Sequence, residues 1–182
     1  MTVNPNNGLL EGVTFIRSPN CNERPENTLI DLIVIHNISL PPEEFGGPYI
    51  TAFFTNTLDT RLHPYFLNLV DLKVSCHCLI RRDGSLIQYV PFTERAWHAG
   101  PSSFEGRENC NDYSIGIELE GSDEVAYTLE QYEVLVELLS CLKEIYKDIT
   151  LDRIVGHSAI APDRKTDPGS AFDWVRLAQL LT

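Results

Sequence analysis

The run Leu29–Ile35 limits the possible folds of this chain more than any other segment. It reads LIDLIVI, so apolar and often β-branched residues follow one another almost without interruption. A strand with one solvated face alternates apolar and polar residues, whereas a continuous apolar run indicates a strand buried on both faces. We therefore expect a central strand in a sheet that is covered on both sides, with His36 at its end.

Two further segments have strand character. Residues 74–81 and 85–90 flank Asp83-Gly84, a pair typical of hairpin turns whose central residues need positive φ. Between residues 113 and 120 the apolar positions alternate, which puts Glu118 on the face opposite the core side. The core side of that strand carries Ile115, Ile117 and Leu119.

The second half of the chain predicts helices. Thr128 and Gln131 form a capping-box pattern, and apolar residues then recur at helical spacing as far as Tyr146. These residues are Tyr132, Leu135, Val136, Leu139, Leu142, Ile145 and Tyr146. A last helix is expected to begin near Ser170, with Asp173 completing a second capping box. Its inward-facing residues would be Trp174, Leu177 and Leu181.

Strands and helices alternate in the 182 residues without an internal repeat. This order predicts an α/β protein with one domain, in which a central mixed β-sheet has helices packed on its faces. Residues 1–28 are polar and rich in Asn and Pro, so we expect them to be an N-terminal extension that packs on the domain formed by residues 29–182.

Charge and cysteine content narrow the classes of function. The net charge of −12 argues against nucleic acid and anionic membranes as partners, because both are bound through a basic face. We find no signal peptide and no transmembrane run, and five cysteines are an odd number in a chain large enough to fold without disulfides. These observations favour a cytoplasmic protein with reduced thiols and a small-molecule substrate.

His36, His157 and Asp167 are candidate metal ligands. Each lies at the end of an apolar strand or in the loop after one, where open sheets place their sites. Two imidazoles and a carboxylate can hold a catalytic zinc ion and leave a fourth position open for water. From the pattern alone, a histidine at a strand end is more often a satisfied polar residue.

Glu118 and Lys165 are candidate catalytic residues. A carboxylate that is partly desolvated near a metal has a raised pKa and suits a general base, although exposure on a one-sided sheet is the simpler interpretation of Glu118. Lys165 precedes Asp167 by two residues and would face charge developing on a substrate oxygen, or lie solvated in a polar loop.

Cys76-His77-Cys78 has the wrong spacing for a zinc knuckle, and we interpret its cysteines as core residues. His63 and His98 either line a pocket or cap local turns. Trp97 offers a stacking face for a sugar or peptide, or simply packs.

Four long segments resemble the family-2 N-acetylmuramoyl-L-alanine amidases, and in particular their cytoplasmic members that act on 1,6-anhydro-muropeptides. The segments are VIHNISLPPEEFGGPYI, HCLIRRDGSLIQYVPFTERAWHAG, CNDYSIGIELEG and GHSAIAPDRKTDPGSAFDW, which lie between residues 34 and 174. The resemblance implies the fold of the peptidoglycan recognition proteins and zinc-dependent hydrolysis of the bond between N-acetylmuramic acid and L-alanine. It also implies a role in muropeptide recycling, with an anhydromuropeptide as substrate, and we expect a monomer.

By the same resemblance His36, His157 and Asp167 match the zinc ligands of the family, Glu118 its catalytic glutamate and Lys165 its transition-state lysine. Further matches concern the substrate site, where we expect Asn37, Tyr65, Trp97 and Lys73. Three positions depart from the family pattern: Lys73 and Asn109 stand where arginine is common, and Ala159 where an acidic residue often occurs. These departures concern substrate affinity and stem-peptide preference more than the reaction.

Two alternatives remain open from the sequence. Related recognition domains keep the fold, lose a zinc ligand and only bind, but Asp167 supplies a third ligand here. A secreted amidase acting on polymeric cell wall would use the same chemistry. The acidic surface and the odd number of thiols argue against it.

Overall fold

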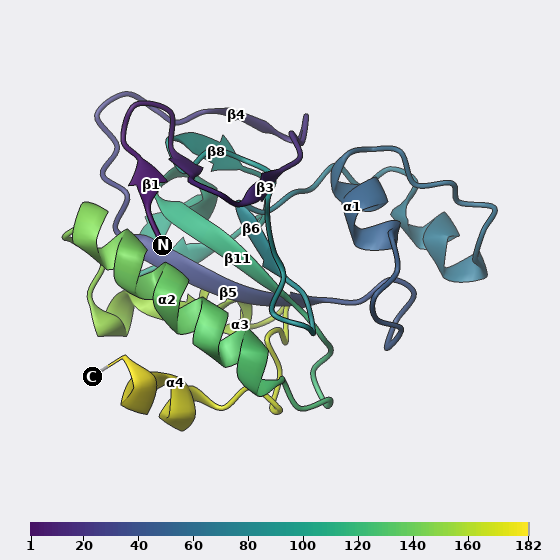
Figure 1. Ribbon diagram of the computed structural model, residues 1–182. Helices are drawn as coiled ribbons and strands as arrows, with labels where there is room; N and C mark the ends of the chain where they lie inside the picture. Colours follow the sequence, from purple (N-terminus) through teal and green to yellow (C-terminus); the bar gives the residue numbers. More distant parts are fainter. Residues whose placement is uncertain (182) are drawn as a thin grey trace.

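The computed structural model describes residues 1–181, and a six-stranded mixed sheet lies at its centre (Figure 1). The strands stand in the order β12, β5, β11, β6, β7, β3. The first four run parallel, β7 is antiparallel to β6, and β3 is parallel to β7. Their bounds are β3 Thr14–Phe15, β5 Leu32–Ile38, β6 Cys78–Ile80, β7 Leu86–Gln88, β11 Ser114–Glu120 and β12 Ile154–Gly156. The predicted mixed sheet is therefore confirmed.

Strand β5 is central and buried on both faces, as its apolar run predicts. It begins at Leu32 rather than Leu29, whose side chain is 66% exposed. β5 begins there because its two neighbouring strands begin there. β11 starts at Ser114, which pairs with Leu32, and β12 starts at Ile154, which pairs with Ile33. An apolar residue before that point has no neighbouring strand to pair with.

The predicted hairpin forms between β6 and β7, with shorter strands than expected. Only Gly84 has a positive φ, of 79°, so the expectation for both central residues was wrong. The Gly84 N–H donates to the Arg81 carbonyl, and the Asp83 carboxylate accepts from the Ser85 N–H. The turn therefore contains one left-handed residue, Gly84, instead of the two that the Asp83-Gly84 pattern predicts.

Helix α2, Leu129–Ile145, covers one face of the sheet, and α4, Trp174–Leu180, runs beside it (Figure 1). The capping box is confirmed, because Thr128 Oγ1 accepts from Gln131 N and Gln131 Oε1 accepts from Thr128 N. The buried face of α2 packs on the alternate residues of β5 and β11 that point toward it. This core includes Ile33, Ile35, Ile115, Ile117, Leu119, Tyr132, Leu135, Leu138, Leu139 and Leu142.

The last helix begins four residues later than its pattern indicates. Asp173 is the N-cap and accepts from Arg176 N, so it does not complete a box that starts at Ser170. The preceding segment is instead held by Ala171 N, which donates to the carbonyl of Asp123. Leu177 is buried as expected, whereas Trp174 is 38% exposed.

The opposite face of the sheet is covered mainly by loops and by the short helix α3, His157–Ile160. A separate lobe contains α1, Tyr49–Phe54, and a 3₁₀ helix, Pro64–Leu69, and lies to one side of the sheet (Figure 1). It packs on the sheet through a second apolar cluster, which includes Leu79 of β6. The cluster consists of Leu40, Ile50, Phe53, Phe54, Phe66, Cys76, Leu79, Tyr89, Val90 and Ala96. No helix within residues 1–181 has both the length and the apolar character needed to cross a bilayer.

The remaining elements are short. They are β1 Val3–Asn4, β2 Leu9–Leu10, β4 Cys21–Glu23, β8 Glu94–Ala96, β9 Ser103–Phe104, β10 Arg107–Glu108 and the 3₁₀ helices Cys110–Asp112 and Leu151–Arg153. Within residues 1–28, β3 joins the main sheet through β7, and β4 pairs with β8. Thr182, the last residue of the predicted domain, lies outside the described residues.

Removal of the α2 cap should destabilise the domain. The Thr128→Ala change deletes an acceptor for Gln131 N and a donor to the Arg82 carbonyl, so we expect a loss of about 1 kcal/mol in the free energy of unfolding. Urea denaturation followed by circular dichroism measures it. Thr128→Ser keeps the hydroxyl and should stay close to wild type. Equal stability of the alanine and serine variants would contradict the role of the cap.

Candidate metal centre

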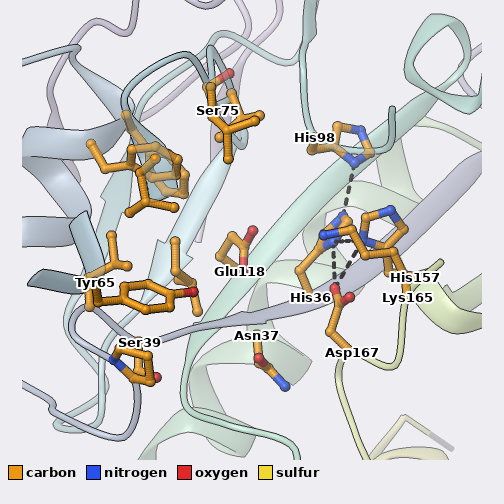
Figure 2. Close-up of a pocket in the computed structure, with 18 residues that line it drawn as sticks. His36, Asn37, Ser39, Tyr65, Ser75, His98, Glu118, His157, Lys165 and Asp167 are labelled. Atoms are coloured by element: carbon orange, nitrogen blue, oxygen red, sulfur yellow. Dashed lines mark hydrogen bonds and ion pairs between the residues drawn. The ribbon is translucent and has the colours of Figure 1, made fainter. Parts of the chain in front are cut away.

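Three potential ligand atoms meet at one point of the structure (Figure 2). His36 Nδ1 lies 2.9 Å from His157 Nδ1, and Asp167 Oδ2 lies 3.0 Å from each of these two nitrogens. All three residues are buried, with exposed fractions of 1%, 2% and 9%. The structure therefore brings together the three residues that the sequence nominates as metal ligands.

The sheet and one short loop position these side chains. His36 is near the carboxyl end of β5, and His157 directly follows the neighbouring parallel strand β12. Asp167 returns to the same place because its carbonyl accepts from Ser158 N at 3.0 Å. A Cβ on Gly156 would lie 2.7 Å from Pro168 Cδ, so this close return needs glycine at the end of β12.

The contacts of His157 determine which of its nitrogens faces the centre as an acceptor. Its Nε2 is 2.9 Å from the carbonyl oxygen of Ala99, which can only accept, so Nε2 carries the hydrogen. In the neutral ring Nδ1 then presents a lone pair toward Asp167 Oδ2. Electron-rich atoms at this spacing are stabilised by a cation between them, and such a donor set suits a divalent transition metal.

Burial sets the charge of His36. It lowers the pKa of this imidazole to about 4, although the Asp167 carboxylate opposes the shift. At neutral pH the imidazole is therefore neutral, which is the state that binds metals.

Glu118 shares the face of the sheet that carries His36, because the two residues are register partners in β11 and β5. Its side chain is buried, and Oε2 has no hydrogen-bond partner among the described residues. Burial and the nearby Asp167 carboxylate raise the pKa of Glu118 well above its ordinary value, although Lys165 opposes the shift. Glu118 is thus not exposed on a solvated face, and its surroundings favour the protonated form of its carboxyl group more than water does.

The three ligand atoms and Glu118 open into a cavity of about 350 Å³. Asn37, Tyr65 and Lys165 also line it, so it contains most of the predicted site residues (Figure 2). One wall is apolar and comes from the side lobe, the adjacent loops and the last residue of β5. That wall comprises Ile38, Leu40, Pro42, Phe53, Phe54, Leu69, Leu72 and Val74. A second hollow, more polar and about 500 Å³, shares Asn37, Lys165 and Asp167 with the first.

Two predicted substrate residues do not line the main cavity. Trp97 donates from Nε1 to Asn22 Oδ1 at 2.6 Å. Lys73 lines a small separate hollow of about 50 Å³ between Phe53 and Leu72. Of the residues whose role the pattern left open, His63 caps the Pro64–Leu69 helix by accepting from Tyr65 N.

His98 belongs to the site, whereas the cysteines of the Cys76-His77-Cys78 segment belong to the core. His98 lines the cavity, and its Nδ1 lies 2.9 Å from His36 Nε2. Cys76 and Cys78 are free and buried, as expected for core residues. Sequence reasoning missed two partners of the site: the Ala99 carbonyl, which has no side-chain signal, and Asp123, which accepts from Asn37 Nδ2 at 2.8 Å.

Comparisons with known proteins show which family the chain is similar to. The family model described as N-acetylmuramoyl-L-alanine amidase matches residues 25–170. The 1,6-anhydro-N-acetylmuramyl-L-alanine amidase AmpD of Escherichia coli is 55% identical over 175 residues, covering 96% of this chain and 95% of that protein. The AmpD of Haemophilus influenzae is 54% identical, covering 93% of this chain and 92% of that protein.

Solved structures extend the comparison to the fold. A crystal structure of a selenomethionine AmpD derivative superposes with a TM-score of 0.96 at 53% identity, and each chain is covered completely. The Escherichia coli amidase AmiD, in complex with the substrate anhydro-N-acetylmuramic acid-L-Ala-D-gamma-Glu-L-Lys, has a TM-score of 0.61 at 30% identity. That match covers 87% of this chain and 60% of the AmiD chain.

The buried histidines make stability pH-dependent in the metal-free protein. Burial, and next the nearby Arg24, lower the pKa of His77 to about 3, whereas an unfolded histidine titrates near 6.5. Below pH 6.5 the unfolded chain binds a proton that the folded state does not, so stability is complete above that pH and is lost as the pH falls.

Between pH 7 and pH 5 we expect a loss of about 2 kcal/mol for each such histidine. Urea unfolding in the presence of a chelator measures the difference. The His77→Gln variant has one titrating group fewer and should lose less stability over the same range. The same loss in both proteins would show that His77 is not the titrating group.

Proposed function

The chain belongs to the N-acetylmuramoyl-L-alanine amidase family, and from this premise we propose that it hydrolyses the amide bond between (1,6-anhydro-)N-acetylmuramic acid and the L-alanine of the stem peptide with the help of zinc. One observation carries the proposal: His36, His157 and Asp167 converge within about 3 Å beside the buried Glu118, whose Oε2 has no hydrogen-bond partner in the part of the chain that the structure describes. A centre for a metal and a proton acceptor are the two components that metal-assisted amide hydrolysis needs.

Zinc fits the donor set. Zinc ligands are commonly imidazole nitrogens and carboxylate oxygens about 2.0–2.1 Å from the ion, so in a tetrahedral site neighbouring ligand atoms lie about 3.3 Å apart. The distances of 2.9–3.0 Å between the three ligand atoms are slightly shorter, so these side chains would move apart by a few tenths of an ångström to admit the ion. When bound, the ion would polarise the lactyl carbonyl and lower the pKa of a water molecule to about 7.

Glu118 is the proposed general base and then the general acid. Its raised pKa makes its carboxylate a better acceptor for the proton of the attacking water and lets it keep this proton for the next step. The protonated carboxyl group then gives this proton to the nitrogen of L-alanine, so that the amine can leave. Because Oε2 has no partner among the described residues, no competing hydrogen bond has to be broken first.

Lys165 is the proposed source of positive charge for the transition state. It lines both hollows beside Asp167, and its backbone is fixed through a hydrogen bond from Lys165 N to the Ala161 carbonyl. An ammonium group held near the carbonyl oxygen stabilises negative charge that develops only during the reaction, which lowers the barrier.

For the substrate we propose contacts with Asn37 and Tyr65, and retain Trp97 and Lys73 as further candidates. The apolar wall of the cavity suits the ring and methyl groups of a muramyl substrate, while the adjoining polar hollow suits a peptide with charged groups. Asn109, at an arginine position of the family pattern, lines a third hollow beside Pro101–Ser103. Preference for the stem peptide is where this chain is expected to differ from its relatives.

We also propose the cellular setting. The enzyme would be a cytoplasmic monomer that recycles muropeptides and binds neither nucleic acid nor membrane, which the acidic net charge of −12 and the five free cysteines support. Residues 29–182 would form the amidase domain, with residues 1–28 as an extension packed on it. Incubation with soluble anhydromuropeptide and, separately, with intact sacculi distinguishes recycling from wall degradation. Mass spectrometry that finds the amide bond intact in both would exclude the activity.

Replacement of Glu118 should remove catalysis without removing the metal. Glu118→Gln and Glu118→Ala delete the group that carries the proton, and we expect a fall in kcat of at least about 10²-fold. Release of the L-alanyl peptide, followed by chromatography, measures the rate, and metal analysis of the same samples serves as the control. Turnover near the wild-type rate with zinc still present would remove Glu118 from the mechanism.

Replacement of a proposed ligand should lower zinc content. His36→Ala and Asp167→Ala each leave two of the three ligand atoms, so both zinc occupancy after dialysis and activity should fall. Asp163→Ala changes an exposed carboxylate in the same loop and should retain zinc. Full zinc content in the His36 or Asp167 variant, measured by inductively coupled plasma mass spectrometry, would contradict the assignment.

A further inference from the structure

His36 uses both of its ring nitrogens. Its Nδ1 faces His157 and Asp167, and its Nε2 lies 2.9 Å from His98 Nδ1 (Figure 2). A neutral imidazole carries one hydrogen, so Nδ1 offers a lone pair to a metal only when that hydrogen is on Nε2. The group that contacts Nε2 therefore decides whether His36 is ready to bind a metal.

A backbone carbonyl at the far end determines the direction of these hydrogen bonds. Ser114 Oγ lies 2.5 Å from the carbonyl oxygen of Cys110, which can only accept, so the single hydroxyl hydrogen points there. Ser114 Oγ is also 3.1 Å from His98 Nε2, and having no second hydrogen it must accept at this contact. His98 consequently carries its hydrogen on Nε2.

The same reasoning continues to the metal centre. With its hydrogen on Nε2, the neutral ring of His98 presents a lone pair at Nδ1 and accepts from His36 Nε2. His36 Nδ1 is then left as a lone pair directed at Asp167 and His157. Through three consecutive hydrogen bonds, the accepting carbonyl of Cys110 thus determines which ring nitrogen of His36 carries the hydrogen.

The ring of His98 is also held in place sterically. A Cβ on Gly116 would lie only 2.4 Å from His98 Cγ, so the ring packs directly on the bare backbone of β11. The backbone of Gly116 is not in the left-handed region, which means that the close approach of His98 is what requires glycine. On the other side, Asn111 Oδ1 accepts from His98 N at 3.0 Å and from Ala99 N at 2.8 Å.

We infer that His98, oriented by Ser114 and seated on Gly116, is a positioning residue that holds His36 in its metal-binding tautomer. The inference rests on the proposed metal centre, and it assigns no contact between His98 and the substrate. Groups of this kind, which bond the second nitrogen of a ligating histidine, typically change metal affinity by about 10–100-fold when they are replaced.

The tautomer can be read directly in the unaltered protein. Long-range ¹H–¹⁵N correlation spectra of the metal-free and zinc-loaded chain distinguish a protonated Nε2 from a protonated Nδ1 for each histidine. We expect hydrogen on Nε2 of both His36 and His98. Hydrogen on Nδ1 of either ring in the metal-free protein would overturn the inference.

Variants test the consequence for metal binding. His98→Phe keeps a ring but removes the acceptor, so zinc affinity, measured by competition with a chromophoric chelator, should fall about 10–100-fold. His98→Gln still offers an oxygen to His36 Nε2 and should retain most of the affinity. Ser114→Ala leaves His98 without its acceptor and should weaken zinc about tenfold.

A matched control separates positioning from general loss of packing. Ser18 is also buried, donates to the Phe54 carbonyl at 2.6 Å and accepts from Asn20 N at 3.1 Å, so Ser18→Ala removes the same kind of hydroxyl away from the ligand atoms. It should lower thermal stability and leave zinc affinity unchanged.

Wild-type affinity and an unchanged Co²⁺ absorption spectrum in both His98→Phe and Ser114→Ala would overturn the inference while leaving the amidase proposal intact. If His98→Phe does not fold, Ser114→Ala and the tautomer spectra decide. A wild-type chain that binds no zinc would instead refute the metal centre. The spectra of the metal-free protein would then still test whether His98 sets the tautomer of His36.

Discussion

The close approach of two imidazole nitrogens and one carboxylate oxygen is the interaction on which the site depends. His36 Nδ1, His157 Nδ1 and Asp167 Oδ2 lie 2.9–3.0 Å apart in a buried position, where electron-rich atoms repel one another unless a cation lies between them. The fold maintains this arrangement through rigid neighbours: two parallel strands, β5 and β12, and the tight return of Asp167 beside Gly156. The same strands would keep the ligands in place before a metal arrives.

The two faces of the sheet have different roles. One face packs against α2 through a mainly apolar core, and the other carries His36 and Glu118 from adjacent strands. Arg24, from the N-terminal region, is partly buried on this second side and donates to the carbonyls of Phe92, Asn111, Asp112 and Ser114. Since Asn111 and Ser114 in turn hold His98, residues 1–28 contribute indirectly to the order of the site. The segment between β8 and β11 therefore connects the hydrogen bonds of Arg24 to those that hold His98 at the metal centre.

Whole-molecule charge and local chemistry differ in this protein. The chain carries a net charge of −12, yet Lys165 stands beside Asp167 in the cavity, and the opposite wall is apolar. A substrate with its own carboxylates can be accepted under these conditions only through local groups, because long-range steering would be repulsive. The hollow beside Asn109, which departs from the family pattern, is the place where this chain and its relatives are expected to differ in substrate preference.

The sequence by itself determined those features whose signals are local. The apolar residues of β5, the turn at Gly84 and the capping box of Thr128 and Gln131 are each specified by neighbours in the chain, so their existence was predictable while their ends were not. Long irregular segments also indicated the family and nominated His36, His157 and Asp167.

Only the tertiary structure decided the rest, because backbone groups and residues distant in the chain made the difference. The last helix starts at Trp174 since the segment before it bonds to the Asp123 carbonyl, and Trp97 turns to Asn22 rather than to the cavity. The tautomer of His36 depends on the carbonyl of Cys110 through two intervening side chains. A carbonyl group is the same in every residue, so the pattern of side chains in the sequence does not predict its direction.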